Sequence, residues 1–415
     1  MTELQALLRS GAISAKEALA AQVLRGQLLN SRFNCVVDQL KVDLNNRGPL
    51  SGIALAHKDI FQLHDRLPGL GVSHGIPQTG LKPAAAIKAL QKAGASQWAS
   101  LVMAPHACGA TSQNSNFIRC INPLDENATV GGSSSGSAVA VASGMSYVAL
   151  GTDTAGSIRI PAATCGLIGL KTTHGAVSTE GCTPLSPSLD SIGIISRYAE
   201  DLREVWSVLC PNIPQSNTKS NWKCHIWLPE NEVDNEVAVA IKRWLSELTI
   251  KAQPIDITDE FTAISRHSLR VLFHETALTH RASLLNGLAE PGVKAIGLMG
   301  LGLPENWYKA SIESRSAFLT VFVNQHFRNA DFLIIPSFSC TVPNWSSVEV
   351  GHPNFDRSQL FGMHRYMSFV NYLGLPSLNL PISKDSRGRP ICLQVISRPY
   401  GEHRLLNFAE QFNPI

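Results

Sequence analysis

Ser157 is the residue of this chain best placed to act as a nucleophile. It lies in the run GTDTAGSIRIPA, residues 151–162, after an apolar segment from Tyr147 to Leu150 that is typical of a short buried strand. The residues after it can begin a helix, because the proline at 161 is tolerated in a first helical turn. A strand, a tight turn and a helix start would surround the Ser157 hydroxyl with backbone N–H groups that lack intrahelical partners. Such donors suit a developing oxyanion.

The base that would accept the Ser157 proton must come from elsewhere, because no residue near Ser157 stands out for that role. Better candidates lie upstream, in GGSSSGSA (131–138) and in the run Ala-His-Lys-Asp that ends at position 59. Lys58 follows an apolar run, and burial disfavours a charged amine and lowers its pKa. Taken alone, a lysine here would more often be a solvated strand end. Serine–lysine pairs are nevertheless a known variant of serine catalysis.

The glycine- and serine-rich run 131–138 permits two other interpretations. It could cradle a phosphate, but it lacks the Gly-Lys-Ser/Thr ending of a P-loop and the spacing of a dinucleotide fingerprint. Residues 132–136 also match G-x-S-x-G, the nucleophile elbow of α/β-hydrolases, with Ser134 as nucleophile. That elbow needs a buried strand just upstream, whereas residues 122–129 are polar and turn-like. We therefore favour Ser157.

These segments resemble the amidase-signature family, whose serine-rich motif is GGSSGGSA and whose nucleophile motif is G-x-D-x-G-G-S-I-R. Ser133 follows Lys58 by 75 positions and Ser157 follows Ser133 by 24, as the family pattern requires. The resemblance implies a Ser-Ser-Lys triad: Ser157 attacks, Ser133 relays the proton in a cis-peptide setting, and neutral Lys58 is the base. It also implies an oxyanion hole formed by the backbone N–H groups of Thr154, Ala155, Gly156 and Ser157.

The resemblance covers nearly the whole chain but includes three departures from the family pattern. Ser135 stands where the family usually has glycine, Ala155 replaces the first glycine of the Gly-Gly pair, and His57 precedes the lysine where a small apolar residue is commoner. Ala155 is tolerable if its position does not require a positive φ. None of the three removes a catalytic side chain. By the same resemblance, Ala107 and Cys108 occupy the segment that lines the substrate pocket.

Two charged residues, Asp153 and Arg159, flank the nucleophile. They could pair and hold the loop around Ser157 in shape. We therefore interpret them as a structural ion pair and not as participants in the chemistry.

The expected fold is a single α/β domain. A length of 415 residues would by itself suggest about two or three domains. The proposed triad spans residues 58–157, however, and the segment FVNYLGLPSLNLPI near the carboxyl terminus resembles the family's closing strand. The resemblance thus implies one domain, residues 1–415, with a mixed central sheet covered by helices on both faces, the amidase-signature fold. Residues 211–330 are expected to form its more variable part, which covers the active site and shapes the substrate pocket as a lid.

Local patterns predict several elements. Ser14, with Glu17 three residues later, is typical of a helix N-cap. Helices are expected in residues 1–31 (two of them), 87–93, 136–143, 236–248, 262–286 and 307–329. Strands are expected at 53–57, 97–103 and 224–228, strands and turns within 163–200, and a polar connector at 211–223.

Bulk composition excludes several classes of protein. The net charge of +3 provides no basic surface of the kind that nucleic-acid-binding proteins use. No amino-terminal signal pattern and no run of 18 apolar residues are visible, so neither secretion nor a membrane span is expected. Nine dispersed cysteines indicate reduced thiols in a cytoplasmic protein. Histidine and cysteine spacings match no metal site, and no cofactor is expected.

The sequence therefore predicts an amidohydrolase that cleaves the C–N bond of a linear carboxamide through a serine acyl-enzyme, releasing an acid and ammonia or an amine. Its expected partner is a small-molecule amide, and a homodimer is left open. Within the family, the alternatives are the A subunit of a glutamyl-tRNA amidotransferase and an allophanate-hydrolase-like enzyme, since DTAGS resembles the latter branch. A catalytically silent scaffold is disfavoured, because all three catalytic side chains are present.

Overall fold

A mixed sheet of eleven strands runs through the molecule. The computed structural model describes residues 1–44, 47–73, 82–213, 221–248 and 250–412. The strands are β1 (Val36–Gln39), β2 (Ala54–Lys58), β3 (Ser96–Leu101), β4 (Val148–Asp153), β5 (Ile168–Lys171), β6 (Ser191–Ser196), β7 (Lys223–Ile226), β8 (Lys251–Pro254), β9 (Phe332–Pro336), β10 (Ser377–Lys384) and β11 (Pro390–Ile396). Their order in the sheet is β1-β3-β2-β4-β6-β5-β10-β11-β9-β7-β8. The predicted α/β fold with a mixed central sheet is confirmed.

Strand direction brings the ends of β2 and β4 to one edge of the sheet. β2 is parallel to both of its neighbours, with Ala56 opposite Ala149 of β4. β6 and β5 continue the sheet in antiparallel pairs beside β4. Because parallel strands end on the same side, residues at the carboxyl ends of β2 and β4 lie close together.

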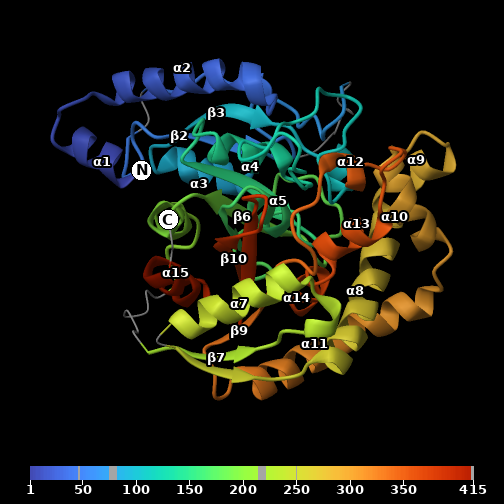
Figure 1. Cartoon of the computed structure of the whole chain (residues 1–415). Helices are drawn as coiled ribbons and strands as arrows, with labels where there is room; N and C mark the ends of the chain where they lie inside the picture. The colour runs from blue at the N-terminus through green and yellow to red at the C-terminus, as the bar shows by residue number, and fades with distance from the viewer. Residues whose placement is uncertain (45–46, 74–81, 214–220, 249, 413–415) are drawn as a thin grey trace.

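Helices surround this sheet. They are α1 (Thr2–Arg9), α2 (Ala15–Phe33), α3 (Ala85–Lys92), α4 (Ser135–Ala142), α5 (Arg159–Thr164), α6 (Ala199–Leu209), α7 (Asn235–Glu247), α8 (Thr258–Thr279), α9 (Arg281–Leu285), α10 (Pro291–Leu301), α11 (Glu305–His326), α12 (Trp345–Val348), α13 (Arg357–His364), α14 (Ser368–Leu373) and α15 (Glu402–Phe412), with single 3₁₀ turns η1 (Pro105–Ala107) and η2 (Glu230–Glu232). In Figure 1, α2 lies along the top beyond β3, whereas α8 and α11 lie at the right and lower rim.

Successive strand residues point into two separate hydrophobic cores, as the alternation of a β-strand requires. Val148 and Leu150 of β4 join the core that also receives apolar residues of α3, α6 and α15. Ala149, between them, joins a second core with the apolar residues of α4. The sheet is therefore covered on both faces, and its central strands are buried throughout.

Most predicted elements are present with shifts of a few residues at their ends. Ser14 caps α2 in a full capping box with Glu17, as predicted. Two predictions were incomplete: the expected helix 262–286 is divided into α8 and α9, and α10 was not anticipated. Part of the expected connector 211–223, namely residues 214–220, lies outside the described residues.

Candidate active site

Lys58 is the last residue of β2, and its side chain is fully buried. Its Nζ donates hydrogen bonds to Ser133 Oγ at 2.8 Å and to Thr152 Oγ1 at 2.9 Å. Burial lowers the pKa of Lys58 to about 7, although the nearby carboxylates of Asp190 and Asp153 favour its charged form. The expected burial of this amine at the end of the apolar run is present in the structure. A large fraction of Lys58 is therefore neutral near physiological pH.

Ser133 lies two residues before α4, in the predicted serine-rich segment. The Gly132–Ser133 peptide bond is cis, as the resemblance implied. The Ser133 side chain is fully buried, and its carbonyl accepts a hydrogen bond from the N–H of Ala104 at 3.0 Å. The hydroxyl is therefore held next to Lys58.

Ser157 follows the turn after β4 and precedes α5, so the predicted strand, turn and helix start are present. The residue retains 9% of its exposure. Its carbonyl accepts a hydrogen bond from the N–H of Ser134 at 3.2 Å, which connects the turn that carries Ser157 to the residue after Ser133. Within the described residues, no hydrogen bond joins the hydroxyls of Ser133 and Ser157. The structure thus pairs Lys58 with Ser133 and places Ser157 beside this pair through the backbone.

Asp153 organises the turn that carries Ser157. Its carboxylate accepts hydrogen bonds from the N–H groups of Gly156 at 2.8 Å and Ile158 at 3.1 Å. Arg159 donates to the same carboxylate through Nε at 3.1 Å and Nη2 at 2.9 Å, and both side chains are fully buried. Burial alone would raise the pKa of Asp153, but Arg159 outweighs it and holds that pKa well below its usual range. The predicted structural ion pair is confirmed.

The expected oxyanion donors differ in their availability. The N–H of Gly156 is engaged by Asp153, so this donor is already occupied. Within the described residues, no hydrogen bond is found for the N–H groups of Thr154, Ala155 and Ser157. Ala155 does not have a positive φ, so alanine fits there. Gly156, by contrast, has a φ of +112°, and a Cβ on it would lie 2.7 Å from Met367 Cγ.

A cavity of about 280 Å³ is lined in part by Thr152, whose hydroxyl accepts a hydrogen bond from Lys58, whereas Lys58, Ser133 and Ser157 themselves are not among its lining residues. Its polar residues include Thr154 and Asp190, whose side chains form a hydrogen bond of 2.6 Å in which Thr154 is the donor. Burial raises the pKa of Asp190 to about 6, despite hydrogen bonds from Thr154 and two backbone N–H groups. Sequence reasoning missed both Thr152 and Asp190. Motif spacing could not reveal them, because their proximity to Lys58 depends on the pairing of the strands.

Ala107 and Cys108, expected to line the substrate pocket, are buried near this centre. Burial raises the pKa of Cys108 to about 12, and Cys108 also interacts electrostatically with Lys58. Ala107 has a φ of +62° and follows His106 at +51°, so this segment is sharply bent. Cys108 therefore lies close to Lys58 as a protonated thiol.

Two of the departures from the family motif, His57 and Ser135, are fully buried. Nδ1 of His57 lies 3.0 Å from Oε1 of Gln97. Burial lowers the pKa of His57 to about 4. Ser135 is fully buried at the start of α4, and its hydroxyl has no hydrogen-bond partner within the described residues. Neither residue is hydrogen-bonded to Lys58 in the part of the chain that the structure describes.

Three general features of the chain bear on its class. All nine cysteines are free, and only Cys340 is partly exposed. In the parts of the chain that the structure describes, no group of three or more His, Cys, Asp or Glu residues could hold a metal ion. Over the same residues, no helix combines the length and apolar character needed to cross a membrane.

Comparison with known proteins identifies relatives along most of the chain. A model of the Amidase family matches residues 35–256 and 282–406. The A subunit of the glutamyl-tRNA(Gln) amidotransferase of Aliarcobacter butzleri (strain RM4018) is 28% identical over 428 residues, which cover 92% of this chain and 92% of that protein. A crystal structure of an amidase, also 28% identical, has a TM-score of 0.86 and covers 99% of this chain and 98% of that one. An allophanate hydrolase of Kluyveromyces lactis, 22% identical, shares the fold, with a TM-score of 0.82 over 98% of this chain and 71% of that one.

Proposed function

The chain belongs to the amidase family, and from this premise we propose that it hydrolyses a small linear carboxamide through a Ser157 acyl-enzyme. The observation that carries the proposal is the buried Lys58, which contacts Ser133 and has a lowered pKa. A lysine that is partly neutral near pH 7 can accept a proton, which an ordinary lysine cannot do efficiently. Lys58 is thus assigned as base, Ser133 as relay and Ser157 as nucleophile.

The proposed reaction has two halves. In the first, Ser157 Oγ attacks the amide carbonyl and its proton passes through Ser133 to Lys58. The resulting oxyanion is stabilised by the N–H groups of Thr154, Ala155 and Ser157, with Gly156 held in place by Asp153. Collapse breaks the C–N bond as the proton returns through Ser133 to the departing nitrogen. Water then attacks the ester and its proton passes through Ser133 to Lys58. The bond between the acyl carbon and Ser157 Oγ breaks as that proton returns to Ser157 Oγ, and the acid is released.

Residues 211–330 are proposed to shape the substrate pocket. Glu275 of α8 accepts hydrogen bonds from the hydroxyls of Ser186 at 2.7 Å and Ser188 at 2.6 Å, in the loop that leads to Asp190. A second contact involves His106, which lies two residues before Cys108. The centre of its ring is 5.0 Å from the centre of the His280 ring. The helical region thus supports two segments near Lys58, which is the arrangement expected of a lid.

A second candidate function is that of an amidotransferase A subunit, which would deliver ammonia to a partner. The similarity to the Aliarcobacter butzleri protein over 92% of both chains favours this candidate. The allophanate-hydrolase-like alternative has support at the level of fold alone. All three candidates use the same nucleophile, so they differ in substrate and partner.

Two assays test the proposal. The purified chain is given a panel of small amides that includes glutamine and allophanate, and ammonia release is measured with Ser157→Ala as control. In parallel, a fluorophosphonate is added and the labelled peptide is identified by mass spectrometry. We expect turnover by the chain alone and a label on Ser157. A label on Ser134 would contradict the assignment, and labelling of Ser157 without turnover of any amide would favour the partner-dependent candidate.

A further inference from the structure

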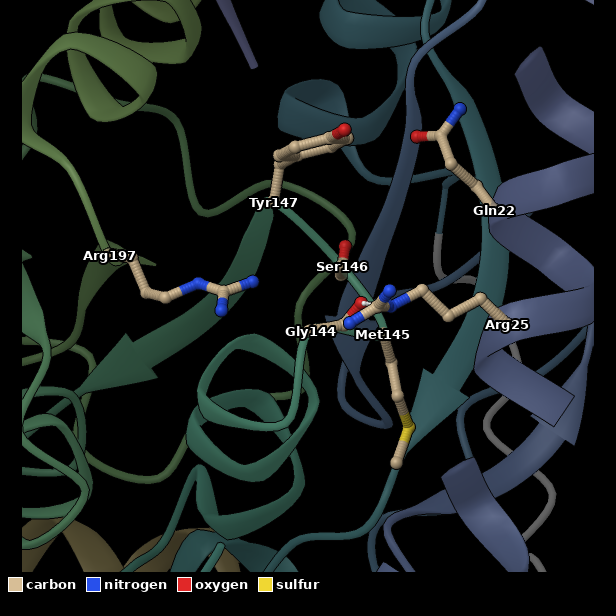
Figure 2. Close-up of a pocket in the computed structure, with 7 residues that line it drawn as sticks. All are labelled: Gln22, Arg25, Gly144, Met145, Ser146, Tyr147 and Arg197. Carbon is tan, nitrogen blue, oxygen red and sulfur yellow. Dashed lines mark hydrogen bonds between the residues drawn. The ribbon is translucent and has the colours of Figure 1, made fainter. Parts of the chain in front are cut away.

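A second pocket lies at the opposite end of β4 from Ser157. The segment from Gly144 to Tyr147 leads into β4, and Arg197 follows its antiparallel neighbour β6. With Gln22 and Arg25 of α2, these residues enclose a cavity of about 250 Å³ (Figure 2). The six residues of β4 separate this cavity from the nucleophile turn by roughly 20 Å. It is therefore distinct from the candidate active site.

Two guanidinium groups converge in this pocket. Figure 2 shows Arg25 and Arg197 directed from opposite sides toward Gly144 and Ser146. The point where a Cβ on Gly144 would lie is 2.9 Å from Nη2 of Arg25 and 3.2 Å from Nη2 of Arg197. Like charges this close repel each other unless an anion lies between them. The arrangement concentrates positive charge at one point.

No carboxylate of the described residues forms an ion pair with Arg25 or Arg197, although Asp201 interacts electrostatically with Arg197. The carboxylate of Asp201 binds the amino group of Met1. Nε of Arg25 donates to the Gly144 carbonyl at 2.9 Å, which aims its two Nη groups into the pocket. For Arg197, no hydrogen bond to any described residue is found. Both guanidinium groups thus have N–H donors available for a ligand.

Tyr147 adds a neutral donor. Burial raises the pKa of Tyr147, the Asp201 carboxylate raises it further, and the charges of Arg197 and Arg25 act in the opposite direction. The phenol is therefore protonated at neutral pH, and within the described residues its hydroxyl has no hydrogen-bond partner. The Ser146 hydroxyl donates its hydrogen bond to the Val148 carbonyl at 2.8 Å, so it has no hydrogen left to donate to a ligand.

From this geometry we propose that the pocket binds a phosphoryl dianion, either as inorganic phosphate or as the terminal group of a small phosphate monoester. Two guanidinium forks match the charge and the several oxygens of such a group, and arginine binds phosphate with paired hydrogen bonds. Tyr147 also lines the pocket, with its hydroxyl on the side of Gln22 (Figure 2). A volume of about 250 Å³ is several times the space that one water molecule occupies, so the group fits.

The test measures binding of inorganic phosphate and of glycerol 3-phosphate to the full chain by calorimetry, at constant ionic strength set with chloride. We expect one saturable site, and Arg197→Gln and Arg25→Gln should each weaken it by about tenfold or more, because each removes charged hydrogen bonds. Arg328→Gln, at an exposed arginine elsewhere on the surface, is the matched control and should bind as the wild type does. Tighter binding of glycerol 3-phosphate than of phosphate would identify a monoester as the ligand, and the reverse would identify free phosphate.

A second measurement uses the wild-type protein, so its result does not depend on whether the variants fold. Phenylglyoxal modifies accessible arginines, and mass spectrometry reports each site separately. Phosphate should protect Arg25 and Arg197 and leave Arg328 unprotected. Equal protection of all three, or displacement of phosphate by an equal concentration of chloride, would overturn the proposal. Unchanged affinity in both pocket variants would do the same.

Discussion

Nζ of Lys58 is shared between two hydroxyls, and Thr152, at 2.9 Å, is as close to it as Ser133. Thr152 belongs to β4, the parallel neighbour of the strand that ends at Lys58. The pairing of β2 with β4 therefore positions the amine of Lys58, and the hydrogen bond to Thr152 holds this amine within hydrogen-bond distance of Ser133. This assigns Thr152 as a positioning residue for the proposed base.

Replacing Thr152 tests this assignment. The hydroxyl oxygen stabilises the charged form of Lys58, so Thr152→Val should lower the pKa of Lys58 further and displace the acid limb of the activity profile to lower pH. The maximal rate should fall by about tenfold, the value of one hydrogen bond to a charged group. Thr152→Ser keeps the hydroxyl and should restore both properties. A Val variant with an unmoved limb would show that Thr152 contributes only packing.

Replacing Ser157 should reduce activity more than replacing Ser133. Ser157→Ala removes the nucleophile and should abolish turnover. Ser133→Ala leaves the nucleophile in place, and water can partly replace the relay, so trace activity should remain after a loss of roughly 10²–10⁴-fold. Steady-state rates of both purified variants provide the comparison. A Ser133→Ala enzyme close to the wild-type rate is incompatible with a relay through Ser133.

Lys58 should dominate the dependence of activity on pH. Its neutral form is the proposed base, and burial lowers its pKa to about 7, so the rate should rise with pH through about 7 and then become level. The Asp190 carboxylate, whose pKa is raised by burial, supports the charged form of Lys58 when it is ionised. The check is a profile of kcat/KM from about pH 5 to about pH 9, on either side of the expected limb.

Substitutions at Lys58 separate a base from a simple positive charge. Lys58→Ala should abolish activity, and the rise in rate near pH 7 should disappear with it. Lys58→Arg should not recover activity, because arginine keeps its proton throughout this range. Recovery by arginine would mean that only the charge matters.

The buried pair of Asp153 and Arg159 should contribute strongly to stability. Arg159→Met leaves the Asp153 carboxylate buried without its charged partner, and such losses cost about 3–5 kcal/mol. Lys242 forms a comparable ion pair with Glu230, but both side chains are more than half exposed. Lys242→Met should therefore cost about 0–1 kcal/mol. Urea unfolding of both variants measures the difference, and equal costs would refute the assigned role.

Local sequence was sufficient to predict features that depend on neighbouring residues. Ser14 with Glu17 indicated the start of α2, whereas the burial of Lys58 was preferred only once the spacing to the two serines was added to the apolar run before it. The short buried strand before Ser157 and the helix start after it likewise follow from local residues. These features need no knowledge of distant contacts.

Other features could not be predicted because distant segments create them. Asp190 reaches the site only because β6, which begins at the next residue, pairs with β4. α10 lacks a clear apolar stripe, since its buried positions include Gly297 and Gly300, so its periodicity is weak. The engagement of the Gly156 N–H by Asp153 depends on the turn closing in three dimensions. Motif spacing contains none of this information.

The contacts of Arg159 also have a consequence for biosynthesis. Its guanidinium donates to Asn371 Oδ1 at 2.6 Å and to Gln394 Oε1 at 2.7 Å, 212 and 235 positions further along the chain. Until the ribosome has added residues 371 and 394, the turn around Ser157 lacks these partners. The turn therefore acquires its final geometry only after β11 has been synthesised and has folded, so a nascent or truncated chain without these residues should remain inert even though it already contains all three residues of the proposed triad.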